Sequence, residues 1–517
     1  MDNRYSKPAI GKNVIDSLTL SMYEDPRFIF REYIQNSADQ IDKAVKEGLL
    51  ENDQGDIHIN IDIERRRISI EDNATGIAES QVQPILLDIA NSTKERGVNK
   101  GFRGIGRLGG LAYCQTLIFE TSFKGEKTKS ILTWDAARLN DIINNRKDRQ
   151  DAAAVISEIT SFHTVPEKAS EHYFRVIMEG VSSEELLNKE SVENYLSMVA
   201  PVPFPTQFVY KSKIYNELKS EGIHLDEYRI FLNTDQLFKG YSTSIYDLQG
   251  TNQKAKSDEL IDIAFFKEAD DNNNLLYWGW YGVSLLKGQM QSVNKARGFR
   301  LRKANIQIGD EETLSRLQKE RRFNTYFFGE VHAIHPQLVP NARRDYFIDN
   351  QMCKVFQLKL KDYFFTHISN LCRQASNINA TMKKIQAVED MEKQFKQKQQ
   401  NGFDNHEESK GFREKFESKK KEALDAVKKL TKIGKDAKDT HEDTVKKILN
   451  RAAPKNIVIK VESIELPANR KTKLRVNTLK GLSKEEKKLL GRVFMIIRDV
   501  FDPSTAENLI KKIEEDI

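Results

Sequence analysis

The stretch REYIQNSADQIDKA (31–44) decides how the first part of this chain is interpreted. Apolar residues recur through it at helical spacing, which predicts an amphipathic helix. Glu32, Asn36 and Asp39 are separated by four and three positions, so they share one face of that helix beside the apolar stripe. An amide oxygen is a hard ligand that suits Mg²⁺, and a carboxylate one turn away can accept a proton from water. The alternative is a solvated polar face whose charges pair with neighbouring cations.

The segments around this helix predict an α/β domain over residues 1–185. The helix starts at Asp25-Pro26, where Asp suits the N-cap and Pro the first helical position, and it ends near Gly48. After it, apolar and polar residues alternate with period two, as they do in half-buried strands. The predicted strands are 57–64 and 68–72, joined as a hairpin, then 115–123, 129–134 and 172–180, with a further helix near 80–90.

A second polar pattern, Asp72-Asn-Ala74-Thr-Gly76-Ile77, comes where the predicted strand 68–72 ends. The carboxylate of Asp72 can accept a hydrogen bond from an exocyclic amine, which would select adenine over guanine. A glycine nearby lets a flat base lie against the backbone. An ordinary Asx-type turn is the alternative.

The third pattern is the glycine-rich stretch GFRGIGRLGG (101–110). Backbone amides freed by glycines at the start of a helix form an anion cradle, and the polar residues Thr93 and Lys94 before it suit a lid over a nucleotide. The letters 104–109 also spell the Gly-x-Gly-x-x-Gly of dinucleotide sites, but no strand precedes them, and the Gly-Lys-Ser/Thr ending of a P-loop is missing. A flexible glycine loop is the remaining alternative.

These three patterns, in this order, resemble the GHKL ATPase superfamily, which includes the HtpG chaperones, MutL, the gyrase B subunit, MORC proteins and histidine kinases. REYIQNSADQIDKA is similar to the helix of the chaperone branch, and STK followed by GFRG (92–104) is similar to the MutL branch. The resemblance covers about residues 25–110. It implies a Bergerat-type α/β sandwich, in which helices cover one face of a mixed sheet.

The resemblance also implies a role for each matching residue. Glu32 would be the general base, Asn36 the magnesium ligand and Asp72 the partner of the adenine amine. The residues that would line the ATP site are Asp39, Gly76, Ile77, Thr93, Lys94, Gly101, Phe102, Arg103, Gly104, Ile105, Gly106 and, as the family's threonine near the base, Thr164. Ala74 departs from the usual Asp-x-Gly-x-Gly pattern, and because alanine resists a positive φ angle, this loop is expected to differ.

Residues 186–375 predict a second α/β domain, with strands at 261–268, 275–283, 298–309 and 327–335. Within it, LVPNARRD (338–345) is similar to the chaperone segment that carries an arginine to the γ-phosphate of ATP. Alignment on the asparagine gives this role to Arg344, with Arg343 as the alternative. Such an arginine stabilises the charge that develops during phosphoryl transfer. A surface arginine paired with Asp345 is the other interpretation.

The C-terminal third is rich in Lys, Glu, Gln and Ala. Residues 376–450 predict long, solvated, coiled-coil-like helices, and 451–517 a small α-rich domain with one strand-like run, NIVIKVESI (456–464). The clusters Lys419–Lys421 and Lys428-Lys429 are the best candidates for contact with DNA or a protein partner.

Composition narrows the function classes only slightly. A net charge of +6 over 517 residues permits nucleic-acid binding without requiring it. The three cysteines are scattered, which fits a reducing cytosol and argues against a zinc ribbon, and no apolar run predicts a transmembrane helix. The sequence is thus that expected of a cytoplasmic protein, and the resemblance implies a Mg²⁺-dependent ATPase that works as a clamp-like homodimer on a protein client or DNA. The alternatives are an ATP-gated interaction scaffold and a nucleic-acid-binding protein.

Overall fold

The computed structural model describes residues 10–18, 25–89, 106–145, 147, 149–250, 253–403, 406–433, 440–453, 457–467 and 481–516. The chain divides into two compact units. The first consists of residues 1–284 and 288–369, and the second of residues 285–287 and 370–517.

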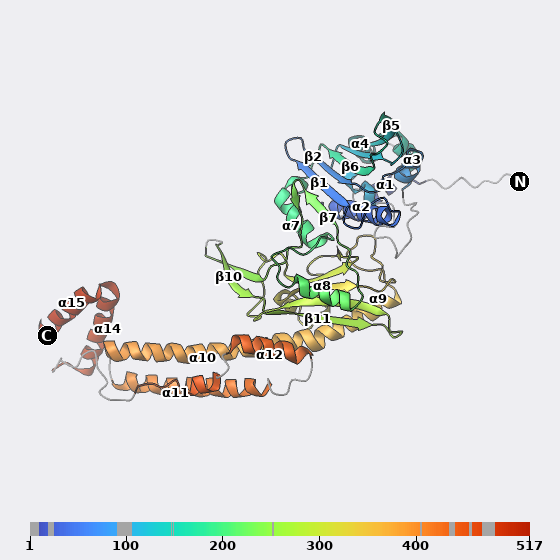
Figure 1. Cartoon of the computed structure of the whole chain (residues 1–517). Coiled ribbons are helices and arrows are strands. Elements are labelled where there is room, and N and C mark those ends of the chain that lie inside the picture. Colours follow the sequence, from blue (N-terminus) through green and yellow to red (C-terminus); the bar gives the residue numbers. More distant parts are fainter. Residues whose placement is uncertain are drawn as a thin grey trace. The chain divides into compact units, whose positions relative to one another are not determined.

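The first unit contains a mixed sheet, in which Figure 1 labels β1, β2, β5, β6 and β7. The sheet has eight strands in the order β5-β4-β3-β6-β2-β1-β7-β8. β1 pairs in parallel with β7, and the other neighbours are antiparallel. The strands are β1 (Asp56–Asp62), β2 (Arg67–Asp72), β3 (Thr116–Ser122), β4 (Thr128–Asp135), β5 (Thr160–Pro166), β6 (Tyr173–Glu179), β7 (Arg229–Leu232) and β8 (Asp235–Gln236). The predicted β1–β2 hairpin is confirmed, and Arg66 adopts a φ of 47° in its turn.

Helices cover one face of this sheet, as the α/β prediction required. The alternate isoleucines of β1 are buried together with Ile34 and Ile41 of α2 in one core. The helices are α1 (Asn13–Leu18), α2 (Phe28–Lys46), α3 (Glu79–Leu87), the 3₁₀ helix η1 (Gly106–Ala112), α4 (Ala136–Asn144), α5 (Ala152–Ile159), α6 (Glu184–Leu187) and α7 (Lys189–Val199). The next helix, α8 (Lys211–Ser220), instead buries Ile214 and Leu218 in a second core together with Trp278 and Trp280. α2 begins later than Asp25 because the Asp25 carboxylate accepts from the backbone N–H of Arg27 at 2.9 Å and forms a turn before the helix.

A second, five-stranded sheet follows in the same unit, with the order β11-β12-β15-β13-β14. Its strands are β11 (Asp262–Ala269), β12 (Leu275–Val283), β13 (Gly298–Lys303), β14 (Ile306–Ile308) and β15 (Phe328–Ala333), and β9 (Ser244–Gln249) pairs with β10 (Gln253–Glu259) as a separate ribbon. Short turns η2 (Ser315–Leu317) and η3 (Arg321–Tyr326), helix α9 (Gln351–Tyr363) and the π-helical turn η4 (Phe364–Ile368) complete it. The strands predicted at 261–268, 275–283 and 327–335 are confirmed. The single strand predicted at 298–309 is wrong, because the chain turns at Ala304 and Asn305, both with positive φ, and forms the antiparallel pair β13 and β14.

A buried ion cluster ties the two sheets together. Lys239, just after β8, lies 2.8 Å from the carboxylate of Glu330 on β15, and Arg302 on β13 lies 2.5 Å from the same carboxylate. All three side chains are fully buried. Burial alone raises the pKa of Glu330, but Arg302 and Lys239 together hold it well below its usual range. The second sheet is thus anchored to the edge of the first by paired charges, and losing one partner would leave an uncompensated buried charge.

The second unit is helical. It contains α10 (Ser369–Asn401), α11 (His406–Ile433), α12 (Thr440–Ala452), α13 (Ile457–Glu462), α14 (Lys484–Val500) and α15 (Pro503–Asp516). The strand predicted at 456–464 is wrong, because this run forms α13. Ile457, Val461 and Ile464 lie at helical spacing and are buried together against α11, so tertiary packing overrides their β propensity. No helix among the described residues combines the length and apolar character needed to cross a membrane.

Candidate functional site

The polar face of α2 is buried. Glu32 and Asp39 are each only 7% exposed, and Asn36 is partly exposed. Buried carboxylates are costly unless they have partners, so this face is not the solvated surface that the sequence left open.

Glu32 pairs with Arg344. Nε of Arg344 lies 2.7 Å from Oε1 of Glu32, and both side chains are 9% exposed. Arg344 adopts a φ of 55°, which is uncommon for a residue other than glycine. The two residues predicted as catalytic, 312 positions apart in the chain, therefore meet in one buried ion pair.

Neighbouring contacts hold the Arg344 segment against α2. The guanidinium of Arg31 donates to the carbonyls of Gln307 and Arg343, both at 3.3 Å, and lies 3.6 Å from the ring centre of Phe28. The backbone N–H of Gly309 donates to the carbonyl of Arg344 at 2.7 Å. The loop after β14 and the backbone of residues 343–344 thus reach α2 from the second sheet.

The end of the glycine-rich stretch packs directly on Glu32. A Cβ added to Gly106 would lie 2.0 Å from Oε2 of Glu32, so any side chain at this position would displace the Glu32 carboxylate. The hydroxyl of Tyr33 donates to the carbonyl of Arg107 at 3.0 Å and accepts from the N–H of Gly110 at 3.1 Å. Burial lowers the pKa of the Arg107 guanidinium to about 10, which leaves it cationic at neutral pH. Thr93, Lys94, Gly101, Phe102, Arg103, Gly104 and Ile105 lie outside the described residues.

The loop after β2 forms the Asx-type turn that the sequence left as the alternative. Asp72 is 1% exposed, and its carboxylate accepts from the N–H of Ala74 at 3.2 Å, which is an Asx-type turn in a buried setting. Gly76 has a φ of 65°, and a Cβ there would lie 1.9 Å from the carbonyl oxygen of Ser122. Ala74 is not one of the described residues that have a positive φ angle. The alanine therefore fits its position, and the required glycine is Gly76.

Thr121, which the sequence did not single out, lies at this loop. Its hydroxyl accepts from the N–H of Ile77 at 2.8 Å and donates to the carbonyl of Tyr173 at 2.9 Å. Thr164 is exposed on β5, at the edge of the sheet. β5 is four strands from β2, which at about 4.8 Å per strand is roughly 19 Å from Asp72. The structure therefore does not bring Thr164 to the loop. The sequence signal for Thr121 was its place in the strand pattern, because it continues the alternate buried positions of β3.

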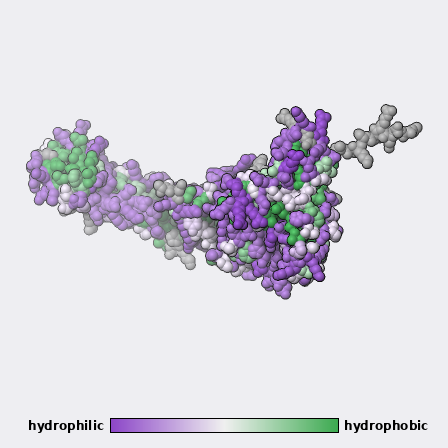
Figure 2. All heavy atoms as spheres, turned by 90° about the horizontal axis from the view of Figure 1, so that it is seen from above, coloured by the Kyte–Doolittle hydropathy of each residue, from purple (hydrophilic) through white to green (hydrophobic). Residues whose placement is uncertain are grey.

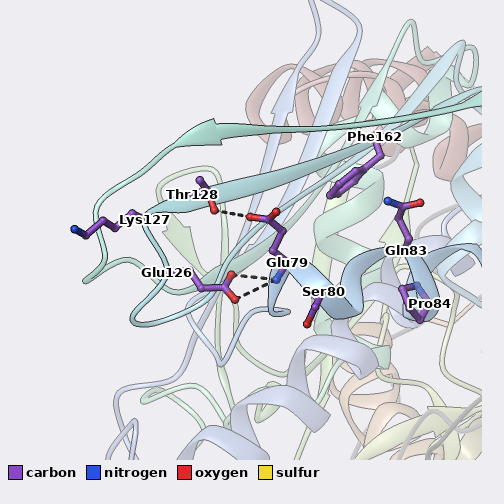
Figure 3. Close-up of a pocket in the computed structure, with 8 residues that line it drawn as sticks. All are labelled: Glu79, Ser80, Gln83, Pro84, Glu126, Lys127, Thr128 and Phe162. Carbon is purple, nitrogen blue, oxygen red and sulfur yellow. Dashed lines mark hydrogen bonds between the residues drawn. The ribbon is translucent and has the colours of Figure 1, made fainter.

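A separate hollow lies beside the N-terminus of α3 (Figure 3). It has a volume of about 610 Å³ and is lined by Glu79, Ser80, Gln83, Pro84, Glu126, Lys127, Thr128 and Phe162. The Glu126 carboxylate accepts from the N–H of Glu79 at 3.0 Å, and Thr128 donates to the Glu79 side chain at 2.8 Å. None of the predicted site residues lines it, and its two carboxylates would repel a triphosphate.

Residues 25–171 match the model of the family described as histidine kinase-, DNA gyrase B-, and HSP90-like ATPase. Chaperone protein HtpG of Mycobacterium tuberculosis (strain ATCC 25618 / H37Rv) and that of Mycobacterium bovis (strain BCG / Pasteur 1173P2) are each 32% identical over 90 residues. That match covers 16% of this chain and only 14% of either chaperone. Residues 25–171 therefore carry a domain of the histidine kinase-, gyrase B- and HSP90-like ATPase family, the GHKL superfamily.

Proposed function

We propose that this chain binds ATP with Mg²⁺ through its first sheet and α2, and hydrolyses it to drive a clamp-like cycle. The observation that carries the proposal is the convergence on Glu32, where Gly106 of the glycine-rich stretch and Arg344 of the second sheet region both meet one buried carboxylate. The family match to residues 25–171 supports the nucleotide class.

In the proposed reaction, Glu32 accepts a proton from a water molecule as the water oxygen bonds to the γ-phosphorus. The bond between that phosphorus and the bridging oxygen breaks, which gives ADP and phosphate. Oε1 of Glu32 lies 2.7 Å from Nε of Arg344, so the attacking water would reach this oxygen only after the ion pair opens. Arg344 must release the carboxylate for this step and then stabilises charge on the phosphate.

Magnesium would supply charge neutralisation at the phosphate oxygens. No group of three or more His, Cys, Asp or Glu side chains in the described part of the chain forms a metal cage. Mg²⁺ commonly uses one or two protein oxygens and completes its shell with phosphate and water, so the partly exposed Asn36 amide suits it.

We further propose that the chain works as a cytoplasmic homodimer on a protein client, as the similarity to a segment of HtpG favours. DNA contact through the C-terminal helices is the second candidate, and two of its lysines already have partners within the chain. Lys420 donates to the carbonyl of Glu462 at 2.9 Å, and Lys419 lies 3.5 Å from Glu422. The structure thus favours a solvated helical face there over a continuous basic surface.

Replacing Asn36 with alanine tests the magnesium site. We expect Mg²⁺-dependent ATP affinity to fall about 10- to 100-fold, the usual cost of disturbing a metal site. Calorimetric titration of the full chain with ATP, with and without Mg²⁺, measures it. Asn144→Ala, at an exposed position of α4, is the control and should bind as the wild type does. Equal Mg²⁺-dependent affinity for Asn36→Ala and the wild type would remove Asn36 from the site.

A further inference from the structure

The β13–β14 hairpin joins the buried ion cluster to the Arg344 segment. Figure 2 shows a surface on which hydrophilic residues, drawn in purple, predominate, and charged side chains normally lie at such a surface. Arg302 on β13 is instead fully buried with Glu330. Its guanidinium donates to the carbonyl of Met198, near the end of α7, at 2.6 Å and to the carbonyl of Asn305 at 2.8 Å. The cluster therefore holds the hairpin as well as the edge of the first sheet.

Asn305 fixes the turn of this hairpin. Ala304 and Asn305 have φ angles of 49° and 57°, so both central residues of the two-residue turn lie in the left-handed region. Asn305 is buried, its amide oxygen accepts from Nζ of Lys239 at 2.8 Å, and its amide nitrogen donates to the carbonyl of Asp226 at 2.6 Å. Asp226 precedes β7 and Lys239 follows β8. Asn305 thus attaches the tip of the hairpin to the last two strands of the first sheet.

The opposite end of the hairpin reaches Arg344. The carbonyl of Gln307 accepts from Arg31 of α2 at 3.3 Å. The N–H of Gly309, directly after β14, donates to the carbonyl of Arg344 at 2.7 Å. Gly309 has a φ of 65°, and a Cβ there would lie 2.7 Å from the carbonyl oxygen of Asp345. Glycine is therefore required where the end of β14 meets the arginine segment.

The position of Arg344 depends on this short hairpin. β14 has three residues and pairs with β13 at the edge of the second sheet, and so short a strand has little stability of its own. Arg344 holds a φ of 55°, an uncommon conformation that persists only when its surroundings fix it. A shift of the hairpin would move Gly309 and, through its hydrogen bond, the backbone that carries the guanidinium to Glu32.

We propose that Asn305 is a positioning residue for Arg344. It fixes the tip of the β13–β14 hairpin to the first sheet, and the other end of the hairpin then holds Arg344 on the Glu32 carboxylate and, when ATP is bound, at the γ-phosphate. Asn305 acts through the hairpin backbone and not on ATP itself. The inference rests on the proposed role of Arg344 in turnover, but the ion pair of the nucleotide-free protein allows a test without ATP.

The first test needs no nucleotide. Asn305→Gly removes both side-chain hydrogen bonds and keeps a residue that accepts a positive φ. The midpoint of thermal unfolding is measured for Glu32→Gln, Arg344→Ala and their double variant, with and without Asn305→Gly. Without it, the double variant should recover part of the summed loss, and with it the losses should simply add, because Arg344 no longer lies on Glu32. A recovery of equal size in both backgrounds, or none in either, overturns the proposal.

Asn273→Gly is the matched control. Asn273 also has a positive φ, 63°, in the turn between β11 and β12, but it is exposed. This change should leave the recovery intact, and its loss here too would overturn a specific role for Asn305. Gly309→Ala, at the other end of the hairpin, should abolish the recovery as Asn305→Gly does, and it decides the question if Asn305→Gly does not fold. Far-ultraviolet circular dichroism checks the fold of every variant.

The second test uses ATP turnover by the full chain. Asn305→Gly should lower kcat about 10- to 100-fold with little change in KM, because a small displacement of a catalytic group can cost that much. In the Arg344→Ala background the same change should lower kcat no further, since the group that Asn305 positions is gone. An unchanged kcat, or an equal loss in both backgrounds, overturns the proposal. If the wild type hydrolyses no ATP, the proposed function fails, and the unfolding test still decides the role of Asn305.

Discussion

Glu32→Gln binds ATP but releases phosphate about 10²- to 10⁴-fold more slowly than the wild type, the usual contribution of a general base. Glutamine keeps the shape of the side chain against Gly106 but does not accept the proton of the attacking water. The measurement is single-turnover phosphate release, with ATP affinity measured in parallel. Glu64→Gln, at the exposed β1–β2 turn, is the matched control and should leave both quantities unchanged.

The loss of the ion pair must be separated from the loss of the base. Glu32→Gln leaves the Arg344 guanidinium buried without its counter-ion, so thermal unfolding should show a lower midpoint. If ATP binding is retained and turnover alone is lost, the effect is catalytic. Turnover at the wild-type rate in Glu32→Gln would show that another group accepts the proton.

Arg344→Ala lowers kcat by about 10³-fold or more, the scale at which arginines act on phosphoryl transfer, while KM for ATP changes much less. Arg344 reaches the site from the second sheet region, so its charge matters most when negative charge develops on the γ-phosphate. Steady-state phosphate release measures both constants. Arg343→Ala is the control, because Arg343 is exposed and is the alternative of the sequence alignment.

The ion pair gives this prediction a second readout. Arg344→Ala and Glu32→Gln should each lower the midpoint of thermal unfolding, and the double variant should recover part of the loss because neither charge is left buried alone. A variant pair whose effects simply add would show that Glu32 and Arg344 do not interact in solution. If Arg343→Ala loses turnover and Arg344→Ala does not, Arg343 is the arginine that stabilises the γ-phosphate.

Helix α2 and five strands of the first sheet (β1, β2, β3, β4 and β6) were predictable, because the strands alternate with period two and α2 carries a clear apolar stripe. The sequence analysis did not predict β5, β7 or β8, and β7 and β8 join this sheet from beyond residue 185. The run 457–464 was not, since its β-branched residues suit a strand locally and only packing against α11 makes them a helix. The residue types in a short segment do not reveal which other elements of the fold will pack against that segment.

The candidate site was predictable where motifs are local and not where contacts are distant. The positions of Glu32, Asp72 and Gly106 followed from short patterns, but nothing in those patterns shows that the Gly106 backbone lies on the Glu32 carboxylate. Thr164 was chosen for its place before a strand, whereas strand order decides which threonine reaches the loop, and that order arises from pairing across the sheet. The catalytic and binding roles themselves stay predictions.

The most direct measurement is a crystal structure of the full chain with Mg²⁺ and a non-hydrolysable ATP analogue. The account predicts the adenine amine at about 3 Å from the Asp72 carboxylate, the metal ion on the Asn36 amide oxygen, and the γ-phosphate between Glu32 and Arg344 with their ion pair opened. Two results would contradict this account. One is an analogue bound elsewhere, such as in the hollow beside α3. The other is a Glu32–Arg344 pair that stays closed over an empty site at millimolar nucleotide.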